Sequence, residues 1–183
     1  MADDTRDDVP ASTSTTKATL PKTKLPKGMI LGKDGKPCRT CNSLADFTSQ
    51  SKVLKSTPAI TSASAMAAVP ADCPADVEAL GRSSWTLLHS ISATYPVAPT
   101  TQEQSDVKSF LGLFGKLYPC WVCAEDFQEY MEREKIKASS RDEFGRWLCG
   151  AHNEVNRKLG KKEFDCNLWE ERWRTGWKDG RCG

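Results

Sequence analysis

Two cysteines separated by two residues, Cys120 and Cys123, follow Pro119 directly and stand at the start of a helix-like run. A pair with this spacing can close a small disulfide, and the free N–H groups and positive dipole end of a helix stabilise a thiolate there. The same spacing could supply two ligands of a tetrahedral zinc site. The nearest other dithiol, Cys38 and Cys41, is too distant in the sequence for a zinc ribbon. The pattern therefore favours redox chemistry.

The amino-acid composition limits the cellular compartments and the binding partners that we expect for this protein. Eight cysteines in 183 residues are many for a reducing cytosol, so we expect an oxidising compartment. The acidic N-terminus lacks the features of a secretory signal and of an Arg-rich matrix presequence. No apolar run approaches the roughly 18 residues that span a membrane. The formal charge of +2 favours neither a nucleic-acid partner nor an acidic membrane surface, so we expect no nucleic acid and no membrane insertion.

The chain divides near residue 72. Residues 11–27 and 49–69 are rich in Ser, Thr, Ala, Lys and Pro and poor in large apolar groups, which predicts mobile tethers. The first dithiol lies between them, after a turn signal at 33–37. We therefore predict that residues 1–72 form a mostly disordered arm that carries a dithiol to and from a fixed site. Residues 73–183 hold all six tryptophans, both histidines and six of the eight cysteines, which predicts one compact domain.

The periodicity of that domain is helical throughout. Asp76 is a plausible N-cap for a helix that stops at Pro96, and Thr100 with Glu103 is a capping-box pattern for a helix that stops before Pro119. The third helix begins at the dithiol. A second capping-box pattern, Ser140 with Glu143, opens a helix that ends at Gly160. The predicted core stripes are Val77, Leu80, Ser84, Leu88, Ile91 and Tyr95; Val107, Phe110, Leu111, Phe114 and Leu117; and Phe144, Trp147, Leu148, Ala151, Val155 and Leu159.

No alternating strand pattern competes with these helices. The predicted fold is therefore all-α: a four-helix bundle with a short fifth helix near Leu168 to Trp177, preceded by a flexible N-terminal arm.

A polar stripe marks one face of the last long helix. Cys149, His152, Asn153 and Asn156 recur at i, i+3, i+4 and i+7 and present a sulfur, an imidazole and two amides. A lone histidine is more often a satisfied core or cap residue. Together with aromatic and cationic residues elsewhere in the sequence, however, the stripe favours a binding site for a flat aromatic ligand over a purely structural histidine. These residues are Trp85, His89, Arg172, Trp173 and Trp177.

Four segments of the sequence carry a resemblance to a known family. Residues 81–89, 118–123, 152–161 and 164–166 resemble the FAD-dependent sulfhydryl oxidases of the Erv/ALR family, over about residues 73–183. The arm dithiol resembles the shuttle pair of the mitochondrial member. The ending 177–182 is similar to that of the animal members, called augmenter of liver regeneration. Trp121 and Val122 are a departure, because animal relatives carry acidic residues there.

The resemblance implies a path for electrons. A substrate dithiol reduces the Cys38–Cys41 disulfide, and the arm passes the electrons to Cys120, which we expect to be the more accessible sulfur of its pair. Cys123 then faces the flavin, and the final acceptor is oxygen or cytochrome c. The implied partner is a dithiol-bearing import oxidoreductase of the mitochondrial intermembrane space. The implied role is disulfide formation in the relay that supports protein import.

The resemblance also implies the residues that contact FAD. Several are cationic and would meet the pyrophosphate or adenine. The implied contacts are Gly81, Arg82, Ser83, Trp85, His89, Tyr118, Cys149, His152, Asn153, Val155, Asn156, Lys158, Lys161, Arg172 and Trp173.

The remaining cysteines have structural roles in this scheme. We expect a Cys149–Cys166 disulfide that holds the C-terminal segment over the cofactor and contributes about 3 kcal/mol. Cys73 and Cys182 match no local partner, so they either bond to each other or join two protomers. The resemblance implies a homodimer and favours the cross-protomer bridge. We expect no metal.

Three other classes remain as alternatives. A flavin-free, thioredoxin-like dithiol carrier would need a strand before the dithiol and a parallel sheet, and the sequence shows neither. A zinc-dependent scaffold would use the dithiols as metal clips. A secretory-pathway sulfhydryl oxidase should carry an N-terminal signal or anchor. This sequence shows none, which favours the mitochondrial intermembrane space.

Overall fold

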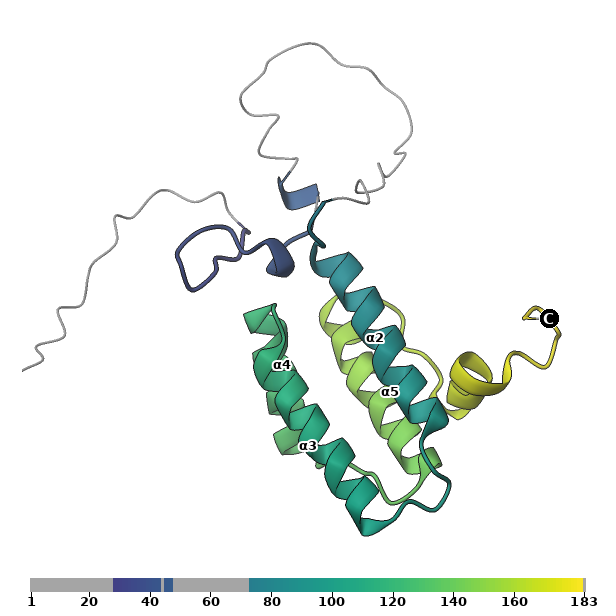
Figure 1. The fold of residues 1–183 in the computed structure, drawn as a ribbon. Coiled ribbons are helices and arrows are strands. Elements are labelled where there is room, and N and C mark those ends of the chain that lie inside the picture. Colours follow the sequence, from purple (N-terminus) through teal and green to yellow (C-terminus); the bar gives the residue numbers. More distant parts are fainter. Residues whose placement is uncertain (1–27, 44, 48–72, 183) are drawn as a thin grey trace, which may run out of the picture.

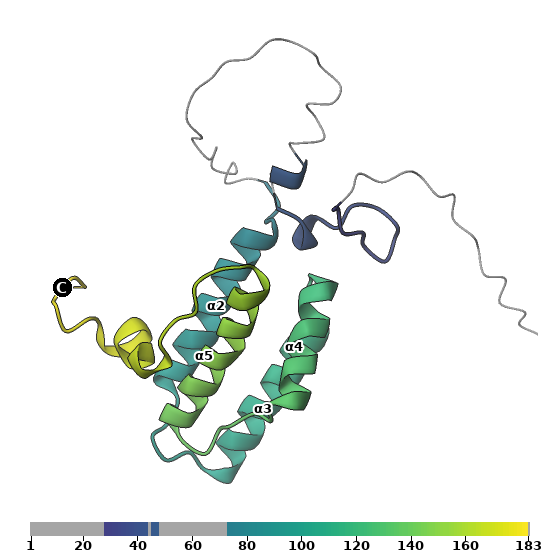
Figure 2. The same cartoon turned by 180° about the vertical axis from the view of Figure 1, so that it is seen from behind.

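The computed structural model describes residues 28–43, 45–47 and 73–182. The chain order of the elements is η1 (Arg39–Cys41), α2 (Val77–Thr94), α3 (Thr101–Leu117), α4 (Trp121–Arg133), α5 (Arg141–Lys158), η3 (Cys166–Leu168) and η4 (Glu171–Thr175). Helix α2 packs along α5, and α3 packs along α4 (Figures 1 and 2). The predicted four-helix bundle is confirmed. The described ranges contain no sheet, only an isolated bridge between Leu31 and Pro37.

Side-chain caps explain where the first two long helices begin and end. The Asp76 carboxylate accepts the N–H of Ala79 at 2.9 Å, which fixes the start of α2. The predicted capping box of α3 is complete: the Thr100 hydroxyl accepts the Glu103 N–H at 3.2 Å, and the Glu103 carboxylate accepts the Thr100 N–H at 2.7 Å. Helix α3 ends at Leu117, and the next residue, Tyr118, is extended because a proline follows it.

Only one of the two hydrogen bonds of the capping box predicted for α5 is present. The Ser140 hydroxyl accepts the Glu143 N–H at 3.1 Å, as expected. The Glu143 carboxylate instead accepts a hydrogen bond from the hydroxyl of Ser139, which competes as a nearby donor. The other end of α5 agrees with the prediction, because Gly160 has a φ of 66° that an L-residue rarely adopts.

The short fifth helix lies close to its predicted place but differs in form. It consists of a 3-10 turn, η3, and a π-helical turn, η4, and it starts before the predicted Leu168. The Asp165 side chain accepts the Asn167 N–H at 2.9 Å and so caps the earlier start. The segment ends at Gly176, where φ is 77°.

The core lies between the two helix pairs, and three predicted core positions are wrong. Phe110, Leu117 and Leu159 are exposed, and Leu117 keeps 77% of its surface in solvent. The cause for α3 is that it packs mainly against α4, so the described residues cover only part of its apolar stripe. Leu159 lies one residue beyond the end of α5. The buried hydrophobic cluster consists of Leu88, Tyr95, Val107, Leu111, Tyr130, Ala138, Phe144, Trp147, Leu148 and Ala151.

A close approach at Gly145 fixes the C-terminal segment onto α5. A Cβ at Gly145 would lie 2.5 Å from Cε3 of Trp169, a fully buried ring whose indole N–H donates to Asp142 at 2.9 Å. We expect Gly145→Ala to lower the free energy of unfolding by about 1–3 kcal/mol. The matched control is Gly112→Ala on α3, where a Cβ meets nothing within 4 Å, and it should raise the free energy of unfolding by about 0.5–1 kcal/mol.

Urea unfolding followed by circular dichroism measures both substitutions. Equal effects of the two would contradict the close contact between Gly145 and Trp169.

Part of the N-terminal arm packs on the bundle. We name residues 28–43 the arm hairpin; its two sides meet at the bridge between Leu31 and Pro37. The carbonyl of Asn42 accepts the N–H of Val77 at 3.3 Å, and the guanidinium of Arg39 donates to the carbonyl of Pro74. The hairpin lies at the end of the bundle where α2 and α4 begin (Figure 1). The dithiol segment that lies between the two predicted tethers therefore makes specific contacts with the bundle.

The predicted tethers at 11–27 and 49–69 lie outside the described residues. Within the described ranges, no helix combines the length and the apolar character that crossing a bilayer requires.

Candidate functional site

The dithiol lies at the first turn of α4, as predicted. Cys120 and Cys123 form a disulfide, and Cys120 is the N-cap residue with an extended backbone. Its sulfur accepts the N–H of Cys123 at 3.3 Å. In the reduced pair the same N–H and the positive end of the helix would stabilise a thiolate at Cys120.

The prediction that Cys120 is the more accessible sulfur of its pair is wrong. Cys120 has 0% of its surface exposed, whereas Cys123 is partly exposed. Both neighbours of Cys120 contact the arm hairpin: the Thr40 hydroxyl donates to the carbonyl of Pro119 at 3.1 Å, and the Trp121 indole donates to the carbonyl of Leu31 at 2.6 Å. The first turn of an isolated helix would be open to solvent. In this structure the arm hairpin packs against that turn, on both sides of Cys120.

The other cysteines divide into bonded and free. Cys38 and Cys41 form a disulfide across η1, in which Cys41 is buried at 5% exposure and Cys38 is partly exposed. Cys73 and Cys182 are both free and exposed. The alternative in which these two bond within one chain is therefore not what the structure has.

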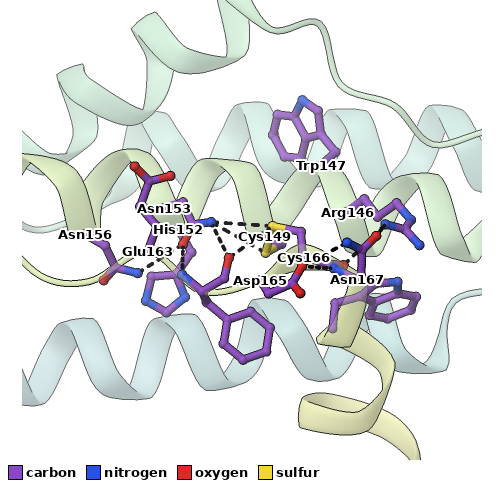
Figure 3. The surroundings of a disulfide bond; sticks show 12 residues. Arg146, Trp147, Cys149, His152, Asn153, Asn156, Glu163, Asp165, Cys166 and Asn167 are labelled. Atoms are coloured by element: carbon purple, nitrogen blue, oxygen red, sulfur yellow. Dashed lines mark hydrogen bonds between the residues drawn. A yellow bond between two sulfur atoms is a disulfide. The ribbon is translucent and has the colours of Figure 1, made fainter.

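A third disulfide, Cys149–Cys166, ties α5 to η3, as predicted (Figure 3). Asn153 reinforces this link. Its amide donates to the Phe164 carbonyl and accepts the Phe164 N–H, each at 2.8 Å, and it also accepts from Asn156 at 3.3 Å. The polar atoms of Asn153 are thus used within the chain. Asn153 holds the segment that follows α5 in place.

Four of the ring residues that the sequence singled out, from three elements, meet in the structure, whereas the ring of Trp177 lies edge-on to Phe164 with centroids 6.5 Å apart. Trp85 and His89 come from α2, His152 from α5 and Trp173 from η4, and we name them the ring cluster. Trp85 stacks on His152 with centroids 4.2 Å apart and planes 3° apart. His89 stacks on Trp173 at 4.3 Å and 6°. Nε2 of His89 lies 3.0 Å from Nδ1 of His152, which links the two stacked pairs.

Both imidazoles of the ring cluster are neutral at physiological pH. Burial, and then the charges of His152 and Arg172, lower the pKa of His89 to about 3. Burial, and then Lys161 and Arg172, lower the pKa of His152 to about 4. Nδ1 of His89 is the one buried side-chain nitrogen or oxygen without a hydrogen-bond partner among the described residues. Buried polar atoms usually have a partner, so this nitrogen is suited to a ligand's hydrogen bond.

These lowered pKa values predict a loss of stability in acid. The unfolded chain has an ordinary imidazole pKa near 6.5, so it binds protons at a higher pH than the folded chain. The free energy of unfolding should therefore be highest above about pH 6.5 and fall as the pH drops toward 4. Urea unfolding at about pH 7.5 and about pH 5 measures this, and His152→Gln should flatten the difference. A wild-type stability that is equal at both pH values would contradict the neutral pair.

The predicted cationic contacts are placed unevenly around the ring cluster. The guanidinium of Arg172 lies 4.4 Å from the centroid of the Trp173 ring. Lys161 is exposed but close enough to lower the pKa of His152. Lys158 pairs with Asp126 of α4 at 2.6 Å, so its ammonium also joins two helices.

The remaining predicted contacts lie mainly on α2. Arg82 and Ser83 line a shallow groove on its outer face, together with Thr86 and Ser90. Gly81 has open space at its Cα, since a Cβ there would meet nothing within 4 Å. Tyr118 packs its ring beside Phe114 at 5.2 Å, and Val155 is half-buried on α5.

Sequence reasoning missed Phe127, which connects the dithiol to the ring cluster. Phe127 lies one turn after Cys123 on α4, and its ring meets Trp85 edge-on at 6.4 Å. The i, i+4 spacing from Cys123 was the signal that could have identified it. Asp126, the partner of Lys158, was also missed. Phe127 thus lies one helical turn from Cys123 and meets Trp85 of the ring cluster, which places the dithiol and the ring cluster near each other.

Comparisons with known proteins agree with this geometry. The family model described as "Erv1 / Alr family" matches residues 82–174. The mitochondrial FAD-linked sulfhydryl oxidase ERV1 of Saccharomyces cerevisiae is 44% identical over 82% of this chain and 89% of that protein. The mitochondrial FAD-linked sulfhydryl oxidase erv1 of Schizosaccharomyces pombe is 36% identical over 79% of this chain and 90% of that protein.

A solved structure supports the same assignment. The crystal structure of the FAD binding domain of Erv1 from Saccharomyces cerevisiae is 54% identical, has a TM-score of 0.56, and covers 57% of this chain and 100% of that chain. The chain with this helical bundle and its two CxxC disulfides belongs to the Erv1/Alr family.

Proposed function

We propose that this protein is an FAD-dependent sulfhydryl oxidase that forms disulfides in protein dithiols. One observation carries the proposal: a disulfide at the start of α4 lies one helical turn from Phe127, whose ring meets a ring cluster that holds an unpaired buried nitrogen at His89. Relatives named as FAD-linked sulfhydryl oxidases, at 44% and 36% identity, support it.

The residues present fit FAD. The flat faces of Trp85 and Trp173 suit an aromatic ring system, and Nδ1 of the neutral His89 is free to bond its polar edge. The cations Arg82, Lys161 and Arg172 suit the phosphates. FAD supplies the capacity to take two electrons from a dithiol and to deliver them to an acceptor. The predicted contacts Cys149, Asn153 and Lys158 contribute by holding α4, α5 and η3 around this space.

The arm dithiol takes electrons from the substrate by thiol–disulfide exchange. A substrate thiolate attacks Cys38, the more exposed sulfur of the arm pair, and Cys41 leaves as a thiolate. The second substrate thiol then attacks its own mixed-disulfide sulfur and releases Cys38. The substrate has gained a disulfide, and two electrons and two protons now reside on the arm.

The active pair takes these electrons in the same way. An arm thiolate attacks Cys120, whose two neighbours contact the arm hairpin, and Cys123 leaves as a thiolate. The second arm thiol closes the Cys38–Cys41 disulfide and frees Cys120. The reduced Cys123 lies on the partly exposed side of the pair, one turn from Phe127. We propose oxygen or cytochrome c as the final acceptor.

We also propose a homodimer of domains that span residues 73–183, each with the arm 1–72. Phe110, Leu113 and Leu117 expose a row of apolar side chains along α3, which we name the α3 apolar face. Apolar surfaces of this kind mark protein interfaces. Exposed Cys73 and Cys182 are available for cross-protomer disulfides.

The covalent bridge predicts a dimer band that depends on Cys182. With iodoacetamide present from lysis, wild type should run as a dimer in non-reducing electrophoresis, and Cys182→Ser should run as a monomer or as a weaker dimer band. A wild-type monomer band would refute the covalent bridge. Sedimentation of the same sample reports whether a non-covalent dimer through the α3 apolar face persists.

The compartment we propose is the mitochondrial intermembrane space, with a dithiol-bearing import oxidoreductase as the partner. The mitochondrial relatives support the organelle, and three disulfides in one small chain support an oxidising compartment within it. A secretory-pathway oxidase is the alternative, and fractionation of cells that express the protein distinguishes the two.

Turnover tests the proposed function. The purified protein with FAD should consume oxygen, or reduce cytochrome c, through many cycles while it oxidises reduced thioredoxin. A flavin-free dithiol carrier would exchange one disulfide for each reactive pair and then stop. Stoichiometric oxidation without turnover would therefore contradict the proposal.

A further inference from the structure

The arm hairpin is closed by one buried side chain. Asn42 is only 2% exposed, and its amide makes three hydrogen bonds within the hairpin. It donates to the carbonyls of Ile30 at 2.8 Å and Cys38 at 2.7 Å, and it accepts the N–H of Ile30 at 2.8 Å. The dithiol is thus held at a fixed position within a defined loop.

Two side-chain hydrogen bonds then place this loop against α4. The Trp121 indole donates to the Leu31 carbonyl at 2.6 Å, and the Thr40 hydroxyl donates to the Pro119 carbonyl at 3.1 Å. Pro119 and Trp121 are the residues immediately before and after Cys120. The hairpin is therefore aligned on both sides of the sulfur that it must reach.

The identity of Trp121 matters for this contact. Of the two residues between Cys120 and Cys123, only Trp121 carries a side-chain donor, and the carbonyl of Leu31 is its acceptor. Val122 has no polar side-chain atom. The bond joins residues 90 positions apart in the sequence, so it sets the register between hairpin and helix.

We propose that Trp121 and Asn42 are positioning residues that dock the arm dithiol beside Cys120 and thereby set the preference for protein dithiols over small ones. This inference rests on the proposed function. Docking keeps the two dithiols at a high effective concentration, which speeds transfer between them. A folded protein substrate depends on that transfer, because Cys120 is 0% exposed and a bulky partner cannot reach it. A small dithiol depends on it less, because it can attack Cys123, the partly exposed sulfur of the active pair.

The test compares two rates in the full-length protein with FAD. The rate for reduced thioredoxin is divided by the rate for dithiothreitol, so that a general loss of activity cancels. Trp121→Phe keeps an aromatic ring and removes the N–H, and it should lower this ratio about three- to tenfold. Asn42→Asp turns two donors into charged acceptors that face carbonyls, and it should lower the ratio more than about tenfold. Val122→Ala is the matched control and should keep the wild-type ratio.

A second readout reports docking without any turnover. In the ¹H–¹⁵N NMR spectrum, the indole N–H signal of Trp121 is assigned as the one that is missing from the spectrum of Trp121→Phe. This signal should exchange slowly with water in the wild type and should take a solvent-exposed shift and fast exchange in Asn42→Asp. The Val122→Ala protein should resemble the wild type.

Unchanged ratios in Trp121→Phe and Asn42→Asp would overturn the positioning role. An indole signal that is the same in Asn42→Asp and wild type would overturn the docking by Asn42. Failure of the wild type to turn over dithiothreitol at all would instead refute the proposed function. The NMR readout still tests docking in that case.

Discussion

Cys123→Ser should abolish turnover of every dithiol, whether small or protein-borne. Cys123 is the partly exposed sulfur of the active pair, and Phe127, one turn later on α4, leads from it to the ring cluster. A serine hydroxyl cannot close the disulfide with Cys120, and it is not a thiolate at neutral pH. Electrons could then enter neither the pair nor the cofactor beside it.

Oxygen uptake with dithiothreitol measures this loss. Cys182→Ser is the control, because Cys182 is exposed and lies outside the bundle. That variant should keep the wild-type rate. A Cys123→Ser enzyme with full dithiothreitol oxidase activity would contradict the assignment of the active pair.

Cys38→Ser with Cys41→Ser should strongly slow the oxidation of a folded protein dithiol, by at least about tenfold, and leave dithiothreitol oxidation largely intact. The arm pair is the relay for substrates that cannot approach Cys120 themselves. The hydrogen bonds of Asn42 within the arm hairpin and that of Trp121 to Leu31 use no cysteine sulfur. The arm hairpin should therefore still fold without its disulfide.

Replacing Cys120 should abolish both activities, which distinguishes the relay from the active pair. The rates with reduced thioredoxin and with dithiothreitol are measured side by side. If the arm variant oxidised reduced thioredoxin at the wild-type rate, the substrate would have to dock directly at the active pair and the shuttle assignment would be wrong.

The helices could be predicted closely from the sequence because their ends are set by local chemistry. Asp76, Thr100 and Ser140 cap the starts of α2, α3 and α5, and Pro119 and Gly160 stop α3 and α5. These effects act within a few residues, so the sequence pattern contains them. The disulfide between Cys149 and Cys166 followed from the family resemblance and is present.

The errors arise where several elements meet. Phe110 and Leu117 have the right periodicity for a core, but periodicity does not tell how many helices cover a face. Cys120 is buried beside a hairpin from far away in the sequence, which helix-end reasoning could not foresee. Asn42 follows a dithiol in a polar arm, and nothing local indicates that it folds that arm.

The candidate site also combines features that local sequence predicts with features that depend on tertiary contacts. Trp85, His89 and His152 were predicted from residue types at helical spacing. The structure stacks Trp85 on His152 and joins His152 to His89 through their ring nitrogens. Asn153 belongs to the same stripe, but its amide bonds Phe164. The family resemblance gives the ring residues and Asn153 alike as FAD contacts. Only the structure shows that the ring residues form the ring cluster, whereas Asn153 bonds the backbone of the segment after α5.

The absorbance spectrum of the purified full-length protein tests the central claim most directly. We expect a yellow protein with a bound-flavin spectrum, which loses its visible absorbance when dithiothreitol is added without oxygen and regains it when air is admitted. A protein that retains no flavin after incubation with FAD, or a flavin spectrum that dithiothreitol leaves unchanged while Cys120 and Cys123 become reduced, would contradict it.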